Sequence, residues 1–251
     1  MMRIGLNRFA PRGLAIGLVG LALLLAAGCG QSDSGSTATP SDSPTASSEN
    51  APSGGSDSAV AEQDKSAPLP DMTLGDPKAP IKIIEYASMT CPHCAYFDSA
   101  IFPQLTANYI DTGKVFYTFR EYPLDGIALR ASMVARCVGP DRFFSFVHGL
   151  FHTQIVWANP ETWNNQDLTV EQKFNALADI AKEQAGMSRE DFDACIKNES
   201  LMQQVTEQAK RGQDEYKVSG TPAVYINGDS FAEIGSYESL DARLKELLGE
   251  K

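Results

Sequence analysis

Basic residues, histidine and cysteine are scarce in this chain of 251 residues. The 21 lysines and arginines are outnumbered by 32 aspartates and glutamates, and a net charge of -11 makes nucleic acid a poor partner. The five cysteines include one C-x-x-C pair, and no second C-x-x-C or C-x-x-H completes a zinc site with four ligands. The sequence contains no internal repeat. Apolar residues make up 43% of the chain, which is enough to fill the core of one large domain or two small ones.

The chain also lacks an apolar run that is long enough to cross a membrane comfortably. Its longest run, residues 14–27, follows a basic start that contains Arg3, Arg8 and Arg12 and no acidic residue. This order of a basic start and a short apolar run predicts an export signal over residues 1–28.

The end of this signal, Leu25-Ala26-Ala27-Gly28-Cys29, resembles that of a bacterial lipoprotein signal. In that pattern small residues lead into a cysteine that carries lipid and becomes the mature N-terminus. Cys29 is therefore the predicted lipidation site, and the expected location is outside the cytoplasm, in the periplasm or cell envelope, on a lipid anchor. Ala26 stands where the pattern prefers Leu, so ordinary cleavage near Gly28 and an uncleaved anchor remain alternatives. Without Cys29, four cysteines are left for two pairs.

Residues 29–67 contain almost no large apolar side chain and consist mainly of Ser, Gly, Thr, Pro, Ala and Asp. Such a segment cannot offset its ordering entropy by burial, so we predict a disordered linker. A flexible chain of this length spans about 34 Å on average. The folded part is therefore expected to work a short distance from a membrane.

A strand, a helix and a second strand are predicted after the linker. Residues 81–87 are β-branched and almost continuously apolar, which is typical of a central strand buried on both faces. Residues 114–122 predict the second strand, so the unit is a right-handed βαβ with a parallel strand pair. Between the strands, Pro103 is expected to kink a helix whose apolar residues recur every three or four positions. These residues are Cys94, Phe97, Ile101, Leu105 and Tyr109.

Start and stop signals of helices fill residues 125–216, which are predicted to form a helical insertion. A strand over residues 223–226, a turn at Asn227-Gly228 and a strand around residues 231–234 then predict a hairpin, and residues 237–248 predict a last helix. The signals within the insertion are the capping box of Thr169 and Gln172, the terminator Gly186, and Ser188 with Asp191, flanked by the apolar pair Met187 and Phe192.

The motif that carries chemistry is Cys91-Pro92-His93-Cys94, where the first predicted strand gives way to a helix. Unpaired backbone N–H groups and the positive helix end favour a Cys91 thiolate. We expect Cys91 to be exposed and Cys94 to be buried one turn further in, from where it can attack a mixed disulfide on Cys91. Pro92 suits the start of the helix, where the backbone N–H that proline lacks would have no partner within the helix. His93 adds a hydrogen bond or a positive charge near the sulfur. These effects favour the reduced form and make the disulfide more oxidising. A zinc site and an inert disulfide are the alternatives.

Four motifs in order resemble the DsbA-like branch of the thioredoxin superfamily. By itself Val218-Ser219-Gly220-Thr221-Pro222 is an ordinary turn before a strand, but beside the C-x-x-C pair it matches the cis-proline loop of thioredoxin-fold proteins. The resemblance covers about residues 68–251. The other motifs are Leu74-Gly75-Asp76-Pro77-Lys78-Ala79-Pro80, the strand that ends at Cys91-Pro92-His93-Cys94, and Arg120-Glu121-Tyr122-Pro123-Leu124.

This resemblance implies an α/β fold, namely a thioredoxin fold with an inserted α-helical domain. Residues 68–124 and 217–251 form the thioredoxin-like domain, and residues 125–216 form the insertion. The implied activity is the oxidation of cysteines in reduced secreted or periplasmic proteins, with no cofactor, by Cys91 and Cys94. Thr221, next to Pro222, offers its backbone to an extended substrate peptide. A DsbB-like membrane protein reoxidises the pair.

Glu85 lies six residues before Cys91, where this family keeps a buried acid beneath the active site. An acid in so apolar a strand is costly unless it has a role or a partner. A proton-transfer role and a solvated position at the strand end are both open. The family's basic partner has no clear counterpart, and Arg120 is only a candidate.

Cys137, at the predicted end of a helix, and Cys195, inside another helix, both lie in the insertion. We expect a disulfide between them, which resembles the extra, non-catalytic disulfide of some DsbA-like proteins; two buried free thiols are the alternative. His148 and His152 share a helical face, but no third ligand is evident, so no metal site is expected. The aromatic residues Phe143, Phe144, Phe146, Phe151 and Trp157 predict a core for the insertion, and some of them could instead line a peptide groove.

The favoured function is a dithiol oxidase. One alternative is a disulfide reductase or isomerase kept reduced by a membrane electron donor. It is disfavoured because isomerases of this superfamily tend to dimerise through an added N-terminal domain, whereas here a linker precedes the fold. Another alternative is a non-catalytic peptide- or copper-binding lipoprotein with Cys91 and Cys94 as ligands.

Overall fold

The computed structural model describes residues 68–250, which lie within one compact unit. The predicted export signal and the whole predicted linker, including Cys29, lie outside the described residues. Within the described part, no helix is both long and apolar enough to span a membrane.

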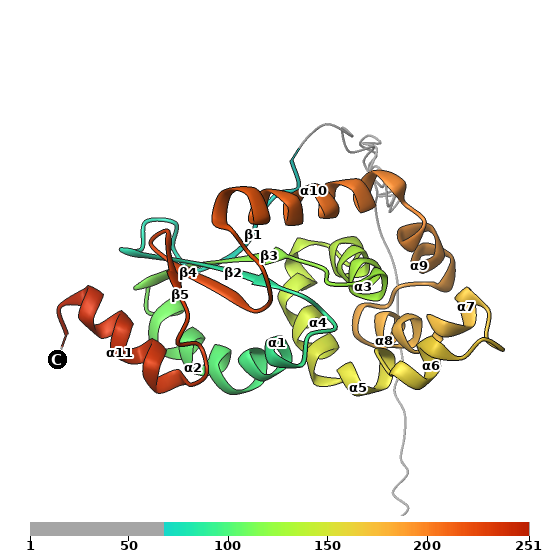
Figure 1. Cartoon of the computed structure of the whole chain (residues 1–251), viewed down its shortest axis with the longest axis horizontal. Helices are drawn as coiled ribbons and strands as arrows, with labels where there is room; N and C mark the ends of the chain where they lie inside the picture. The colour runs from blue at the N-terminus through green and yellow to red at the C-terminus, as the bar shows by residue number, and fades with distance from the viewer. Residues whose placement is uncertain (1–67, 251) are drawn as a thin grey trace, which may run out of the picture. The chain divides into compact units, whose positions relative to one another are not determined.

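A five-stranded sheet forms the centre of the molecule (Figure 1). The strand order is β1-β3-β2-β4-β5, in which β2 and β3 are parallel and the other pairs are antiparallel. The parallel pair confirms the predicted βαβ unit. The two central strands are mostly buried, as their apolar sequences predicted. The strands are β1 (Met72–Leu74), β2 (Ile81–Ala87), β3 (Val115–Glu121), β4 (Ala223–Ile226) and β5 (Asp229–Phe231).

The helical connection between β2 and β3 is broken into short pieces rather than kinked once. Pro103 lies in the first turn of the third piece, where a missing backbone N–H is tolerated. Two of the pieces are π-helical, so the break begins before the proline. In order, the pieces are α1 (Pro92–Tyr96), η1 (Phe97–Ile101), α2 (Phe102–Leu105) and η2 (Thr106–Ile110).

Residues 126–216 contain eight helices, and Figure 1 shows the last of them, α10, on the opposite side of the sheet from α1 and α2. The helix caps follow the sequence signals. Thr169 and Gln172 form the capping box, and Gly186 ends its helix with a left-handed backbone conformation. The Ser188 side chain accepts a hydrogen bond from the Asp191 backbone N–H. The helices are α3 (Gly126–Cys137), α4 (Pro140–His152), α5 (Gln154–Trp157), α6 (Pro160–Asn164), α7 (Val170–Lys173), α8 (Asn175–Ala185), α9 (Arg189–Ile196) and α10 (Glu199–Tyr216).

The hairpin after the insertion differs from its prediction at the second strand. That strand was expected around residues 231–234 but runs over Asp229–Phe231. Asn227 and Gly228 both have positive φ, so they form a two-residue turn and pairing resumes at once, with Ile226 opposite Asp229. The last helix, α11 (Tyr237–Leu248), lies where it was predicted.

The aromatic residues of α4 do more than fill the insertion. Phe143 packs edge-on against Phe119 of β3, with ring centroids 5.6 Å apart, and Phe144 contacts Tyr117 of the same strand at 6.2 Å. This packing joins the helical segment to the sheet. The division into a thioredoxin-like domain and an inserted domain stays a prediction, because residues 68–250 form one compact unit.

Candidate active site

Cys91 and Cys94 lie at the junction of β2 and α1, and both are free thiols in this structure. Cys91 is the N-cap of α1, Pro92 occupies its first turn, and Cys94 lies one turn inside. Cys94 is fully buried, as predicted. The expectation that Cys91 is exposed was wrong, because the residue is only 6% exposed beneath the loop that carries Thr221.

The surroundings of Cys91 favour its thiolate and lower its pKa to about 5. The largest cause is a hydrogen bond from the Cys94 thiol, and further donors are the Thr221 side chain and the backbone N–H groups of Cys94 and His93. Burial opposes the shift but is outweighed. The part of His93 that acts on the sulfur is therefore its backbone at the helix N-terminus.

The pKa of Cys94 is shifted in the opposite direction. Burial raises the pKa of its thiol far above the ordinary value, and hydrogen bonding to Cys91 and the charge of Glu85 add to this effect. The pair is thus polarised, with a thiolate on the outer sulfur and a proton on the inner one. Two sulfurs with such different proton affinities can divide the roles of nucleophile and resolving thiol.

The loop before β4 closes over Cys91. The Thr221–Pro222 peptide bond is cis, and the Cys91 sulfur lies 3.2 Å from the Thr221 carbonyl oxygen. The Thr221 hydroxyl is buried, and among the described residues the Cys91 sulfur is the one group to which it donates. A groove beside the loop is lined by His93, Tyr96, Thr221, Pro222, Ile234 and Gly235.

Helix α5 is attached to the catalytic loop by a residue that sequence reasoning missed. The Gln154 side-chain amide donates to the backbone carbonyls of Met89 at 2.8 Å and Cys91 at 3.1 Å. The next two residues, Ile155 and Val156, are 83% and 60% exposed. The structure thus places exposed apolar side chains close to the cysteine pair.

Glu85 is buried in β2, so a solvated strand end is ruled out. The Tyr117 hydroxyl donates a short hydrogen bond to its carboxylate. Burial is the main cause that raises the pKa of Glu85 to about 8, and the charges of Asp98 and Cys91 also raise it, while the Tyr117 hydrogen bond opposes them. Its charge in turn acts on Cys94.

Arg120 is not the partner of Glu85, contrary to the candidate pairing from the sequence. Its guanidinium binds the Asp71 carboxylate through two bonds of 2.8 Å and the Tyr86 hydroxyl through a third of 2.8 Å. Successive side chains of a strand point to opposite faces, so Arg120 faces away from the side that Tyr117 shares with Glu85.

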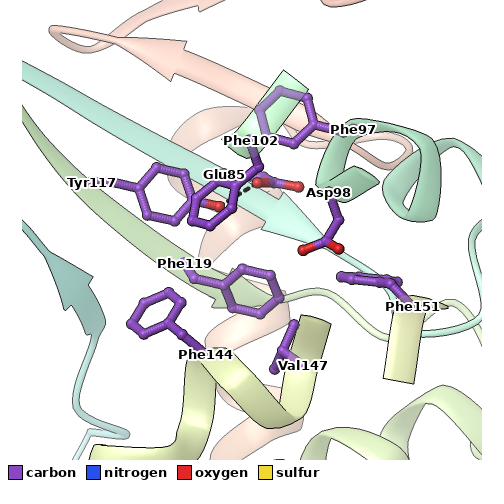
Figure 2. A pocket seen from close by; sticks show the side chains of 9 residues that line it. All are labelled: Glu85, Phe97, Asp98, Phe102, Tyr117, Phe119, Phe144, Val147 and Phe151. Atoms are coloured by element: carbon purple, nitrogen blue, oxygen red, sulfur yellow. Dashed lines mark hydrogen bonds between the residues drawn. The ribbon is translucent and has the colours of Figure 1, made fainter. Parts of the chain in front are cut away.

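A second buried acid, Asp98 of η1, lies near Glu85. The two carboxyl groups line one small cavity, and Figure 2 shows both pointing into the same space among aromatic rings. The other lining residues are Phe97, Phe102, Tyr117, Phe119, Phe144, Val147 and Phe151. Sequence reasoning did not identify Asp98, because its partners come from distant parts of the chain.

Asp98 is bound to His148 of α4, with 2.7 Å between Oδ2 and Nδ1. The His148 and His152 rings stack at a centroid distance of 6.5 Å. No group of three or more side chains suited to a metal ion occurs among the described residues.

Cys137 and Cys195 are joined by a disulfide, and their Cα atoms are 6.3 Å apart. Cys137 ends α3 and Cys195 lies near the end of α9, so the bond links two helices of the insertion.

The comparisons with known proteins agree with this geometry. A family model described as thioredoxin matches residues 68–246. A putative protein-disulfide oxidoreductase of Rickettsia bellii is 32% identical over 72% of this chain. Disulfide bond formation protein D of Bacillus subtilis is 28% identical over 70% of this chain and 77% of its own. The chain covers 53% to 65% of the length of five Rickettsia relatives, which is less than two thirds.

Among solved structures, α-DsbA1 of Wolbachia pipientis is 31% identical, with a TM-score of 0.60. The match covers 72% of this chain and 93% of the Wolbachia chain. The residues matched by the family model, 68–246, include the cysteine pair, the five strands of the sheet and the helices of residues 126–216. The chain therefore belongs to the thioredoxin family, and within it to the DsbA-like proteins.

Proposed function

We propose that this protein is an extracytoplasmic dithiol oxidase that introduces disulfides into secreted proteins. The observation that carries the proposal is the opposite tuning of the two cysteines, because the pKa of Cys91 is lowered to about 5 while that of Cys94 is raised. A thiolate stabilised on Cys91 favours the dithiol form, so the disulfide form accepts electrons readily.

The reaction proceeds in two exchanges. A client thiolate attacks Cys91 in the Cys91–Cys94 disulfide, which forms a mixed disulfide and releases Cys94, and Cys94 then takes up a proton. A second client thiolate attacks the client sulfur of the mixed disulfide, which forms the client disulfide and releases Cys91 as a thiolate. The low pKa of Cys91 makes it a good leaving group in this second step.

Glu85 supplies the proton that Cys94 needs when it leaves. Its carboxyl is buried, and with a pKa near 8 it is mainly protonated at neutral pH. Its ionised form raises the pKa of Cys94, so the two groups are coupled. In the reverse direction the carboxylate can remove the Cys94 proton. This supports the proton-transfer role rather than a purely structural one.

The surface around Cys91 suits an extended client segment. The groove is lined by Thr221, whose carbonyl oxygen lies 3.2 Å from the Cys91 sulfur. The exposed apolar side chains of α5 follow Gln154, which binds the backbone of the cysteine loop. In this proposal the Thr221 backbone holds the client chain and Ile155 and Val156 contact its apolar residues. Unfolded proteins expose both features, so they fit as clients.

The proposed setting is a membrane surface outside the cytoplasm. Cys29 carries the lipid, and residues 29–67 act as the tether. The dithiol form is reoxidised by a membrane redox partner of the DsbB type, and no cofactor is required by the exchange chemistry. Replacement of Cys29 by Ser should release the mature protein from the membrane fraction.

The test is the oxidation of a reduced, unfolded client protein by the purified disulfide form. We expect Cys91→Ser to abolish oxidation. In Cys94→Ser, the Cys91 thiolate should attack a disulfide-bonded client, release one client thiolate and stay trapped as the mixed disulfide, because no Cys94 is present to resolve it. Nearly full activity in both variants would overturn the assignment of the pair. A reduction potential too low to oxidise clients would instead favour a reductase, and copper retained after purification without chelator would favour a metal carrier.

A further inference from the structure

The buried carboxyl group of Glu85 has no direct contact with solvent, yet each catalytic cycle changes its proton. Oxidation of a client requires a proton for Cys94, and reoxidation of the dithiol requires that this proton leave. Each turnover therefore needs a route between Glu85 and bulk water. The proton-transfer role on which this question rests belongs to the proposed function.

The cavity between Glu85 and Asp98 provides a first segment of such a route (Figure 2). The space open to the centre of a water molecule is about 10 Å³, which is close to the minimum for one bound water. A buried water also needs two to four polar partners, and the two carboxyl groups and the Tyr117 hydroxyl supply three. The remaining walls are apolar, so they confine the water to the space between the acids.

Asp98 and His148 provide the second segment. The Asp98 side chain is 11% exposed and the His148 side chain is 55% exposed, and the 2.7 Å bond between them crosses from the buried cavity to the surface. Burial raises the pKa of Asp98, while the facing histidines oppose this shift. Histidine exchanges protons with water near neutral pH, which makes it a suitable surface end for the route.

We propose that Asp98 and His148 form a proton relay that connects Glu85 to solvent through one water molecule in the cavity. During client oxidation, Glu85 gives its proton to the leaving Cys94 sulfur, and a proton from His148 passes through Asp98 and the water to restore the Glu85 carboxyl group. During reoxidation the proton moves outward. His148 and Asp98 act through Glu85 and touch no reacting sulfur, so they are positioning residues.

The groups that influence this route come from every element packed around it. Glu85 on β2, Tyr117 on β3, Cys91 and Cys94 on α1, and Asp98 on η1 meet His148 and His152 of α4. If the Asp98–His148 bond served only to hold η1 against α4, its loss would not change the rate at which Glu85 gains and loses its proton. The relay and the fastening role therefore differ in kinetics and not only in stability.

The test follows the reduced protein after mixing with excess oxidised glutathione, with acid quenching to separate two steps. Attack by Cys91 forms the mixed disulfide, and attack by Cys94 then resolves it. We expect Asp98→Asn to slow the second step at least tenfold at pH 7 and to leave the first within twofold. The control Asp141→Asn removes an equal charge from the exposed first turn of α4 and should change neither step.

Asp98→Asn also separates a relay from simple electrostatics. The charge of Asp98 raises the pKa of Glu85, so its loss would, by electrostatics alone, increase the fraction of Glu85 carboxylate that can accept the Cys94 proton and leave the second step unchanged or faster. The relay predicts a slower step instead. For His148→Ala, the relay predicts a several-fold slower second step that imidazole in the buffer restores, because His148 is exposed enough for imidazole to take its place.

The proposal is overturned if the second step in Asp98→Asn stays within twofold of wild type, or if His148→Ala is as fast as wild type or is not rescued by imidazole. Glutathione exchange is independent of client oxidation. A wild-type protein that exchanges with glutathione but oxidises no client would overturn the proposed function and leave the relay test valid. A wild-type protein that forms no Cys91–Cys94 disulfide would overturn both.

Discussion

At the scale of residues, the site depends on where protons are held. Cys91, at a helix N-terminus, is stabilised as a thiolate, while Cys94 and Glu85 keep protons because burial penalises their charged forms. Each shift makes the stability of one redox state depend on pH, so the tuning can be measured without a client protein.

The first prediction concerns the reduced form. The Cys91 pKa falls from 9.0 to about 5 on folding, so the stabilisation by its thiolate is fully present above pH 9 and is lost as the pH falls towards 5. The difference in free energy of unfolding, reduced minus oxidised, should therefore increase with pH between 5 and 9. The slope is at most about 1.4 kcal/mol per pH unit, and solvent screening at this partly accessible site reduces it.

Denaturant melts of both redox states at pH 5, 7 and 8.5 measure this difference. The comparison should be repeated in Glu85→Gln, which removes the contribution of the shifted Glu85 pKa. We expect the reduced form to be the more stable one at pH 7. An oxidised form that is clearly more stable there would favour a reductase.

The second prediction concerns Glu85. Its pKa rises from 4.5 to about 8 on folding, so the benefit of a neutral buried carboxyl is fully present below pH 4.5 and is lost as the pH rises through 8. Wild type should therefore lose stability relative to Glu85→Gln over this range, by up to about 1.4 kcal/mol per pH unit. Melts of the oxidised proteins at pH 5 and 8 give the comparison, and parallel pH profiles would contradict it.

At the scale of elements, α5 connects the cysteine loop to the helical segment. The Gln154 amide satisfies two backbone carbonyls of that loop, and the same short helix exposes Ile155 and Val156. One four-residue helix thus both supports the site and extends its surface. Its two functions can be separated by mutation, because the supporting and the exposed side chains are different.

The third prediction uses this separation. Ile155→Ser combined with Val156→Ser should raise the KM for an unfolded client about fivefold or more, since the loss of two large apolar contacts removes roughly 1 to 3 kcal/mol of binding. The rate of reaction with glutathione should not change, because the cysteines and Gln154 are intact. Val170→Ser, at another exposed apolar side chain, is the matched control. An equal loss with glutathione and with client would show that the substitutions disturb the loop instead.

Features set by adjacent residues could be predicted from the sequence. The C-x-x-C pair at a strand-to-helix junction, the caps at Thr169 and Ser188 and the Asn227-Gly228 turn each depend on a few neighbouring residues. The three-residue strand β1 was missed because it is a strand only through pairing with β3. No local pattern distinguishes so short a segment from a loop.

Contacts between distant residues explain most of the remaining differences. Asp98 meets His148 fifty residues later, and Gln154 reaches back 63 residues to Cys91. The candidate pairing of Arg120 with Glu85 was wrong for the same reason. Only the register of β2 and β3 shows on which face of the sheet each side chain lies. Cys91 was expected to be exposed because the loop of Thr221, 130 residues away, was not placed over it.

At the scale of the whole molecule, the disulfide between Cys137 and Cys195 stabilises the helical segment across a separation of 58 residues. By limiting the unfolded chain, a disulfide that closes a loop of this size stabilises the folded state by about 4 kcal/mol. We predict that the Cys137→Ala, Cys195→Ala double variant loses stability of this order and keeps the Cys91–Cys94 reaction. Denaturant melts and glutathione exchange on the same samples measure both. A folded double variant without exchange activity would show that the second disulfide is needed by the site itself.

The position of the tryptophans has a practical consequence. The chain has only two, Trp157 and Trp163. The Trp163 indole N–H donates a hydrogen bond to the Trp157 backbone carbonyl. Trp157 ends α5, one turn after the glutamine that binds the loop of Cys91. Movement of that loop on oxidation should alter the packing around both indoles. Intrinsic emission can thus serve as a label-free optical reporter of the redox state, in real time and in the unmodified protein.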